Sequence, residues 1–356
     1  MRVLLVTNGL RYGGAERIVE ALALALKERG DVVAAVATTR DGPLGDTLRA
    51  QGITVEVLGI RSPLDLRVVP ALVRAARRFQ PEVIHSHLAV ADIVVAMSAQ
   101  LLPGVGLVTT VHNSGVELGR LKRALWHTAL RRFDRILAVG EHVLGSLPPG
   151  VAAEIVRPSL IELVRPSSRD EARRALGVRA ETPLVMAVGR LSEIKGFDVL
   201  AEARPLIKTR GARVLVIGEG PEEPRLRGSG LELLGPREDA AALLAAADVV
   251  VCPSRSEGFP QVPIHAMAAR VPVIATRVGG TPEVVIHQHT GILVEREDPR
   301  ALAEAIDALL QDPERARALG AAGLERLRAE GLTRAEMIER TRAAYETILG
   351  ARAVRS

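Results

Sequence analysis

The sequence has very few aromatic residues and a single cysteine. Phe, Trp and Tyr make up 2% of the 356 residues, so Leu, Val, Ala and Ile must form most of the core. The lone Cys252 excludes a disulfide framework and is typical of a protein from a reducing compartment. Because Cys252 ends the apolar run Val249–Cys252, we expect its thiol to be packed and unreactive.

Long apolar runs are also missing. Residues 1–8 contain too short an apolar run for a signal peptide. No run of about 18 residues is free enough of charge, proline and glycine to span a membrane. We therefore expect a cytoplasmic protein, either soluble or bound peripherally to the inner face of a membrane.

The net charge of +5 is unevenly placed, since residues 166–356 carry as many acidic as basic side chains. The excess therefore lies in the first half, where it could serve nucleic acid, anionic lipid or an acidic substrate. We expect no nucleic-acid partner, because the chain has no aromatic-rich basic motif and no zinc-finger spacing. An anionic membrane surface stays open as a partner of the first half.

Residues 120–135 are rich in Arg and Lys, with Leu, Trp and Phe between them. This pattern has two interpretations. One is a basic amphipathic helix that lies on anionic lipid. The other is a solvated surface helix that packs by its apolar side, and we favour this second interpretation.

Strand and helix patterns alternate along both halves of the chain. Alternation of this kind predicts parallel sheets with helices on both faces. Breaks rich in proline, glycine and serine interrupt the pattern near residues 148–150 and 164–168. We therefore predict a first domain over 1–163, a second over 164–332 and a C-terminal segment over 333–356.

The most informative stretch is Pro253–Arg270. It follows a buried strand, contains Glu257 in a glycine-containing turn, and reaches Pro263, where a helix can begin. Free N–H groups at a helix start favour phosphate, and a carboxylate beside them can hold hydroxyl groups. A sugar attached to a diphosphate has both chemical features.

Two other loops have suitable groups for an anion. Arg190 and Lys195 share one strand-to-helix loop, where Arg can bind a diphosphate through its planar fork and Lys as a point charge. Gly13 and Gly14 precede a helix and allow close approach of an anion to its N-terminus. Each signal alone is no stronger than the alternative of surface cations or a turn.

Histidines end two of the predicted strands. His85 and His87 alternate along one strand and so point the same way, which makes a metal pair conceivable. No third ligand has a usable spacing, so we favour hydrogen bonding at the strand end and predict no metal site. His112 ends the next strand and enters a loop, which makes it the better candidate for chemistry.

In combination, these motifs resemble glycosyltransferase family four over nearly the whole chain. The resemblance rests on several segments in order, namely Gly13–Glu16, Pro81–His87, Gly189–Gly196, Gly218–Gly220, Glu257–Pro263 and Pro272–Glu283. It implies a GT-B fold, in which two Rossmann-like doubly wound parallel-sheet domains face a cleft and the C-terminal helix crosses back. It also implies a retaining enzyme that takes a hexose from a nucleotide sugar, UDP- or GDP-linked, without a metal or other cofactor. The acceptor would be a glycan, a lipid-linked intermediate or a small molecule, as in cell-surface polysaccharide or glycolipid biosynthesis.

The resemblance also implies roles for individual residues. Arg190 and Lys195 would hold the diphosphate with backbone at Gly14, Glu257 would hold hydroxyls of the donor sugar, and His112 would contact that sugar near the reacting carbon. The remaining expected donor contacts are Gly13, Gly218, Arg237, Gly258, Phe259, Pro260, Gln261, Val262 and His265. No Asp-x-Asp occurs, which disfavours the metal-dependent GT-A class.

Of four departures from the family pattern, two concern the helix after Glu257; the others are at Gly140–Glu141 and Ser159–Glu162. His265 stands where a second Glu usually holds the ribose hydroxyls, and we expect a charged His to be disfavoured there by the nearby helix N-terminus. Arg270 stands where glycine is usual, and we expect it to crowd the end of the helix. These departures leave an alternative function, a degenerate sugar-nucleotide-binding or partner subunit with little turnover.

Overall fold

The computed structural model describes residues 1–11, 13–60, 65, 67–115, 118–161 and 168–353. The chain divides into two compact units, the first formed by Met1–Pro158 with Arg334–Ser356 and the second by Ser159–Thr333. The predicted boundary between residues 163 and 164 lies outside the described residues. No described helix is both long enough and apolar enough to cross a lipid bilayer.

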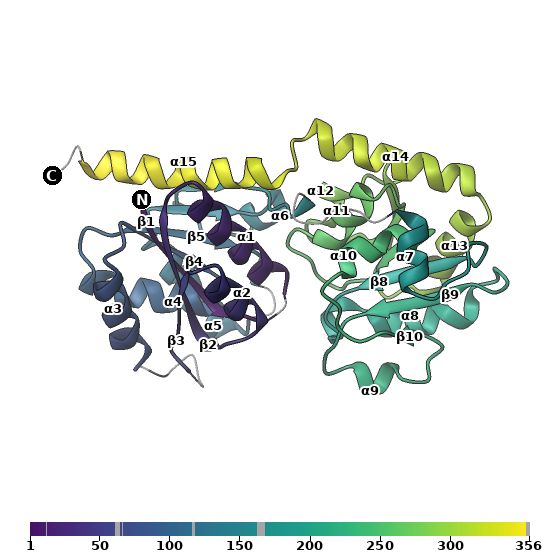
Figure 1. Ribbon diagram of the computed structural model, residues 1–356, viewed down its shortest axis with the longest axis horizontal. Helices are drawn as coiled ribbons and strands as arrows, with labels where there is room; N and C mark the ends of the chain where they lie inside the picture. Colours follow the sequence, from purple (N-terminus) through teal and green to yellow (C-terminus); the bar gives the residue numbers. More distant parts are fainter. Residues whose placement is uncertain (12, 61–64, 66, 116–117, 162–167, 354–356) are drawn as a thin grey trace. The chain divides into compact units, whose positions relative to one another are not determined.

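The first unit is a parallel sheet with helices packed against it (Figure 1). Its strand order is β3-β2-β1-β4-β5-β6-β7. Its strands are β1 (Arg2–Gly9), β2 (Val32–Arg40), β3 (Thr54–Val57), β4 (Val83–His87), β5 (Gly106–Val111), β6 (Arg135–Ala138) and β7 (Ala153–Ile155). Its helices are α1 (Gly14–Glu28), α2 (Pro43–Ala50), α3 (Val68–Phe79), α4 (Ala89–Ser98), α5 (Arg120–Leu130), α6 (Glu141–Leu144) and α15 (Arg334–Ala353).

The second unit repeats this design with strand order β10-β9-β8-β11-β12-β13, again all parallel. Its strands are β8 (Leu184–Val188), β9 (Arg213–Ile217), β10 (Glu232–Leu233), β11 (Val249–Cys252), β12 (Val273–Thr276) and β13 (Gly291–Val294). Its helices are α7 (Arg169–Ala175), α8 (Phe197–Ala203), α9 (Glu223–Leu226), α10 (Ala240–Leu243), α11 (Gln261–Ala268), α12 (Thr281–Val284), α13 (Pro299–Leu310) and α14 (Pro313–Ala329). The predicted pair of parallel-sheet α/β domains is therefore confirmed.

Each strand order contains one switch point. In the first sheet β1 lies between β2 and β4, and in the second β8 lies between β9 and β11. The chain winds in opposite directions on the two sides of such a point, so the loops that leave the neighbouring strands diverge and open a crevice at their carboxyl ends. The loops after β8 and β11 carry Arg190, Lys195 and Glu257, and those after β1 and β4 begin at Leu10 and Leu88.

Helix α15 returns the chain to the first unit, as expected. Tyr345 on this helix is fully buried, and its hydroxyl lies 2.6 Å from Nδ1 of His85 on β4. At the exit from the second unit, the hydroxyl of buried Ser159 donates to the carbonyl of Leu332 at 2.9 Å. The first contact holds α15 on the sheet of the first unit, and the second joins the two points where the chain enters and leaves the second unit.

The structure also corrects two sequence-based element assignments. Helix α11 begins at Gln261 with Pro260 as its N-cap, two residues before the expected start at Pro263. Strand β7 was not predicted, because three strand residues give too little periodicity to be distinguished from a loop. Helix α8 begins directly after Gly196, as the predicted strand-to-helix loop around Arg190 and Lys195 requires.

Candidate functional site

An ion pair joins the loops after β8 and β11. Nζ of Lys195 lies 2.6 Å from Oε1 of Glu257, and the side chains are 32% and 13% exposed. The hydroxyl of Ser254 donates to the same carboxylate oxygen at 2.6 Å. Oε2 of Glu257 has no hydrogen-bond partner in the described part of the chain, which leaves it available to a ligand hydroxyl.

Two glycines let these loops approach closely. Gly196, directly after Lys195, has φ +63°, and a Cβ there would lie 2.0 Å from the carbonyl oxygen of Pro253. Gly279 has φ +50°, and a Cβ there would lie 1.9 Å from the carbonyl oxygen of Glu257. Any larger residue at either position would push the Glu257 loop away from its neighbour.

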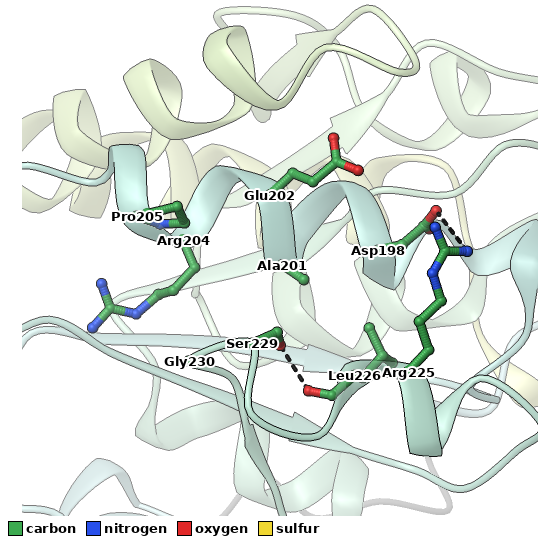
Figure 2. Close-up of a pocket in the computed structure, with 9 residues that line it drawn as sticks. All are labelled: Asp198, Ala201, Glu202, Arg204, Pro205, Arg225, Leu226, Ser229 and Gly230. Carbon is green, nitrogen blue, oxygen red and sulfur yellow. Dashed lines mark hydrogen bonds and ion pairs between the residues drawn. The ribbon is translucent and has the colours of Figure 1, made fainter.

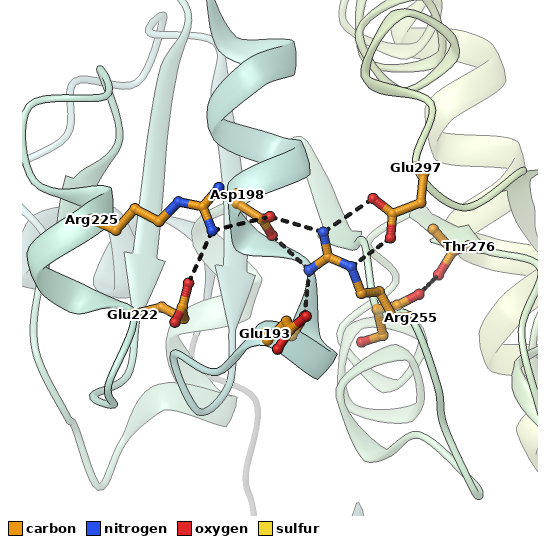
Figure 3. A network of polar contacts seen from close by, with 8 residues as sticks. Glu193, Asp198, Glu222, Arg225, Arg255, Thr276 and Glu297 are labelled. Carbon is orange, nitrogen blue, oxygen red and sulfur yellow. Dashed lines mark hydrogen bonds and ion pairs between the residues drawn. The ribbon is translucent and has the colours of Figure 1, made fainter. Parts of the chain in front are cut away.

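Arg255 clamps the same two loops together (Figure 3). Its guanidinium makes two hydrogen bonds of 2.8 Å to the carboxylate of Asp198 in the first turn of α8, and it also contacts the carboxylate of Glu297 and the carbonyl of Glu193. Its backbone N–H donates to the carbonyl of Ile194 at 2.8 Å. The guanidinium of Arg255 lowers the pKa of Asp198, so this pair stays ionised.

No local pattern in the sequence predicts this clamp. Its partners come from three separate segments, and the only local signal is a cation between two serines in the Glu257 loop. Arg255 fixes the backbone on both sides of the Lys195–Glu257 pair.

Unpaired backbone donors lie beside the ion pair. The N–H groups of Gly258 and Phe259 have no hydrogen-bond partner among the described residues, and the first turn of α11 follows directly. A small pocket of about 30 Å³ lies here, lined in part by Lys195, Glu257, Pro260, Gln261 and Val262. Its volume suits a water molecule rather than a sugar, so a larger ligand would have to lie over its mouth.

The other residues of this unit that were predicted to bind the sugar donor differ in the contacts they make. Arg190 is exposed, and its side chain forms no ion pair with any described residue. The loop after β9, which begins at Gly218, is joined to the Arg190 loop because Leu191 N–H donates to Glu219 O at 2.8 Å. Arg237 is exposed after β10, and Asp239 holds its guanidinium through two bonds of 2.8 Å.

The expectations for His265 and Arg270 both need correction. Because α11 spans only Gln261–Ala268, His265 lies in its last turn, where the helix dipole favours rather than disfavours a positive charge. Arg270 is exposed and adopts φ +59°. Its N–H bonds the carbonyl of Met267 while Val271 N–H bonds that of Ala266, which is the Schellman arrangement. Glycine is therefore usual here because of the left-handed backbone, not because space is short.

In the first unit, Gly13 is the N-cap of α1. The carboxylate of Glu16 folds back onto it, so a Cβ at Gly13 would lie 2.2 Å from Oε2 of Glu16. Gly14 has no such neighbour, since a Cβ there would meet nothing within 4 Å. Gly14 is the more accessible of the two predicted glycines.

His112 is joined to His87 in this unit. Nδ1 of His87 lies 3.0 Å from Nε2 of His112, and Nε2 of His87 is buried without a partner among the described residues. A buried N–H without an acceptor is rarer than a buried acceptor without a donor. His87 is therefore assigned the Nδ1–H tautomer, which leaves His112 with its own Nδ1–H as a donor for a ligand oxygen.

The strand-end hydrogen bonding predicted for His85 is confirmed. Its Nδ1 lies 2.6 Å from the hydroxyl of Tyr345 and its Nε2 lies 2.8 Å from that of Thr110. Burial lowers the pKa of His112 to about 4 and that of His85 to about 3, so both rings are neutral near pH 7. Within the described residues, no three His, Cys, Asp or Glu side chains are grouped as a metal ion would require.

Cys252 is buried at the end of β11, as expected. Burial raises the pKa of its thiol, with a further contribution from the charge of Glu257. The thiol therefore stays protonated and packs as an apolar side chain.

A larger pocket of about 450 Å³ lies elsewhere in the second unit, beside α8 (Figure 2). Two basic side chains, Arg204 and Arg225, and two acidic ones, Asp198 and Glu202, line it. It contains none of the predicted site residues, and its mixed charges give it no preference for an anion. The candidate site is therefore the junction around Lys195 and Glu257.

Two family descriptions match the chain. "Glycosyltransferase Family 4" matches residues 12–157, and "Glycosyl transferases group 1" matches residues 182–312. A D-inositol 3-phosphate glycosyltransferase of Pseudarthrobacter chlorophenolicus is 33% identical over 307 residues, which cover 74% of this chain and 71% of that protein. The chain belongs to glycosyltransferase family 4.

Other members of the family and its fold are similar as well. A GDP-mannose-dependent monoacylated alpha-(1-6)-phosphatidylinositol monomannoside mannosyltransferase of Corynebacterium glutamicum is 36% identical over 248 residues, covering 65% of this chain and 62% of that protein. The crystal structure of Anabaena Alr3699/HepE in complex with UDP-glucose superposes with a TM-score of 0.84 at 21% identity, covering 97% of this chain and 99% of that one. The fold is GT-B.

Proposed function

We propose that this family 4 glycosyltransferase moves a hexose from a UDP- or GDP-linked donor to its acceptor with retention at the anomeric carbon. The observation that carries the proposal is the junction of Lys195 and Glu257 beside the unpaired N–H groups of Gly258 and Phe259. A single small region thus offers a cation, a carboxylate acceptor and backbone donors. A diphosphate that carries a sugar is complementary to all three.

The proposed chemistry follows from charge. When the sugar–phosphate bond breaks, positive charge develops on the sugar and negative charge on the leaving diphosphate. Lys195 and the unpaired Arg190 would stabilise the diphosphate as fixed cations, helped by the first turn of α11. These groups supply the charge that a metal ion supplies elsewhere, so we propose a reaction independent of metal and of any other cofactor.

The sugar would be held through its hydroxyls. Oε2 of Glu257 is available to accept a hydrogen bond, and Nδ1–H of His112 is available to donate one. Acceptor attack would occur on the face that the diphosphate leaves, and the leaving phosphate would take the acceptor's proton. Gly14, Arg237 and His265 would complete the donor contacts at the diphosphate, the base and the ribose.

The donor and acceptor classes rest on similar proteins. Alr3699/HepE was crystallised with UDP-glucose, and the C. glutamicum protein is named as GDP-mannose-dependent and as acting on a phosphatidylinositol mannoside. We propose a hexose donor of one of these two kinds. The proposed acceptor is a glycan, a lipid-linked intermediate or a small molecule in the synthesis of cell-surface polysaccharide or glycolipid.

A panel of nucleotide sugars tests the proposal. UDP-glucose, UDP-galactose, UDP-N-acetylglucosamine and GDP-mannose are screened by thermal shift, and each stabilising donor is then assayed for release of nucleoside diphosphate with and without candidate acceptors. The proposal predicts at least one donor that both binds and turns over. Binding without turnover on any acceptor would instead support the partner-subunit alternative, and no binding at all would contradict both.

A further inference from the structure

Helix α5 exposes an apolar edge. Leu121 is 75% exposed, more than any other large apolar side chain that the structure describes, and Leu125, one turn later on the same face, is 46% exposed. The opposite face of the helix is buried through Trp126, Ala129 and Leu130. The two leucines therefore lie on the solvent side of a helix whose core side is already filled.

Basic side chains flank this edge. Arg120, Lys122 and Arg123 are exposed and form no ion pair with described residues, and residues 118–133 include no acidic side chain. On α14, by contrast, Arg328 is paired with Glu325 and Arg326 with Glu330 at the C-cap of the helix. An unneutralised basic edge with exposed leucines is complementary to an anionic surface that has an apolar interior.

The helix is held rigidly beneath this edge. Nε1 of Trp126 donates to the buried carboxylate of Asp92 at 2.7 Å, and Asp92 also accepts from Ser86 and Thr109 at 2.6 Å each. The indole ring packs so tightly on Gly115 that a Cβ there would lie 2.5 Å from Cζ3. The loop that leaves His112 is thus packed directly against the inner face of α5.

We propose that the outer edge of α5, formed by Leu121 and Leu125 with Arg120, Lys122 and Arg123, docks on an anionic lipid bilayer. This proposal rests on the proposed function and concerns its acceptor, because docking through this surface would bring the His112 loop to a lipid-borne acceptor. The sequence alone favoured a solvated surface helix that packs by its apolar side, and α5 does pack through Trp126, Ala129 and Leu130. The exposure of Leu121 and Leu125 is the observation for which we add a membrane contact on the outer edge.

Vesicle co-sedimentation tests the proposal without any donor or acceptor. The full chain is mixed with vesicles of phosphatidylcholine alone and with vesicles that contain about 30% phosphatidylglycerol, at low and high salt. We expect binding only to the anionic vesicles, and we expect it to weaken as salt screens the charges.

Matched variants locate the surface. Arg120→Gln/Lys122→Gln/Arg123→Gln should lower the partition coefficient roughly 100-fold, and Leu121→Ser/Leu125→Ser about tenfold or more. As controls, Arg210→Gln/Arg300→Gln/Arg317→Gln and Leu206→Ser/Leu234→Ser change exposed side chains of the second unit and should leave binding unchanged.

Three results would overturn the proposal. They are absence of vesicle binding, equal binding to both vesicle types, and α5 variants that bind as the wild type does. Light scattering tests whether a second copy of the chain covers the edge instead. A wild-type dimer that dissociates in Leu121→Ser/Leu125→Ser would assign the edge to that second copy. Because no nucleotide is present, failure here would leave the donor half of the proposed function untouched.

Discussion

Nζ of Lys195 lies 2.6 Å from Oε1 of Glu257, although the two residues are 62 positions apart in the sequence. They come from the loops after β8 and β11, which are neighbours at the switch point of the second sheet. The pair satisfies one carboxylate oxygen and leaves the other available. The cation of the proposed diphosphate site is thus positioned by the carboxylate of the proposed sugar site.

Replacing this carboxylate tests its role in turnover. We expect Glu257→Gln to lower kcat/KM for the donor roughly 10- to 100-fold, because one charged hydrogen bond is worth about 1.5–3 kcal/mol. Steady-state kinetics with the identified donor measures the change. Glu193→Gln, an exposed carboxylate in the Lys195 loop, is the matched control and should retain the wild-type rate. A Glu257→Gln enzyme as fast as the wild type would remove this residue from the site.

His265 offers a test of the ribose assignment. We expect His265→Glu to tighten binding of the donor nucleotide about tenfold, because a carboxylate accepts hydroxyl hydrogen bonds more strongly than an imidazole ring. The neutral control His265→Gln should bind as the wild type does. Isothermal titration with the nucleoside diphosphate gives both affinities. A looser complex for His265→Glu would mean that this chain uses its histidine in another way.

The left-handed backbone at Arg270 predicts a gain in stability. We expect Arg270→Gly to raise the free energy of unfolding by about 1 kcal/mol, because glycine adopts φ +59° without the steric cost of a Cβ. Arg270→Ala removes the same side chain but keeps the Cβ, so it should give no such gain. Urea unfolding followed by circular dichroism compares the variants. Equal stabilisation by both substitutions would show that side-chain crowding matters instead.

Burial of His112 predicts how stability depends on pH. Its pKa falls from 6.5 to about 4 on folding, so between these pH values the unfolded chain binds a proton at this residue and the folded chain does not. Stability should therefore be lost as pH falls from 6.5 towards 4, at about 1.4 kcal/mol per pH unit for this residue. His112→Asn should reduce the slope by that amount.

The chain has one tryptophan, Trp126, whose fluorescence reports unfolding of the unit that contains His112. Urea titrations between pH 6.5 and 4.5 therefore give the slope directly. His289→Asn, which changes an exposed ring in the second unit, is the control and should leave the slope unchanged. If the free energy of unfolding depends on pH with the same slope in the wild type and in His112→Asn, the folded chain does not hold His112 as a neutral ring.

Much of the fold follows from local pattern. The apolar run Val249–Cys252 is a buried strand with the bounds expected of it, and helices α13 and α14 begin at the prolines Pro299 and Pro313 that the sequence marks. Strand β7 was not predicted, since it has three residues and no alternation to distinguish it from a loop. Local pattern therefore identifies elements with a clear apolar run or period and misses one as short and irregular as β7.

Site residues follow the same rule. Glu257, Lys195 and His112 stand next to strand ends, where a parallel sheet is expected to gather its ligands. The contacts that position them are long-range, such as those of Arg255 with Asp198 and Glu297, and no local spacing in the sequence predicts them. The bond from His87 to His112 depends on β4 and β5 being neighbours, which only the sheet order reveals.

The proposed function depends above all on Lys195 and its neighbours binding the diphosphate of the donor without a metal. Calorimetric titration of UDP and GDP in the presence of EDTA measures this binding, with Lys195→Ala and the exposed control Lys208→Ala beside the wild type. We expect one nucleotide to bind the wild type and Lys208→Ala equally, and Lys195→Ala roughly 10- to 100-fold more weakly. Unchanged affinity in Lys195→Ala, or binding that EDTA abolishes, would contradict this proposal.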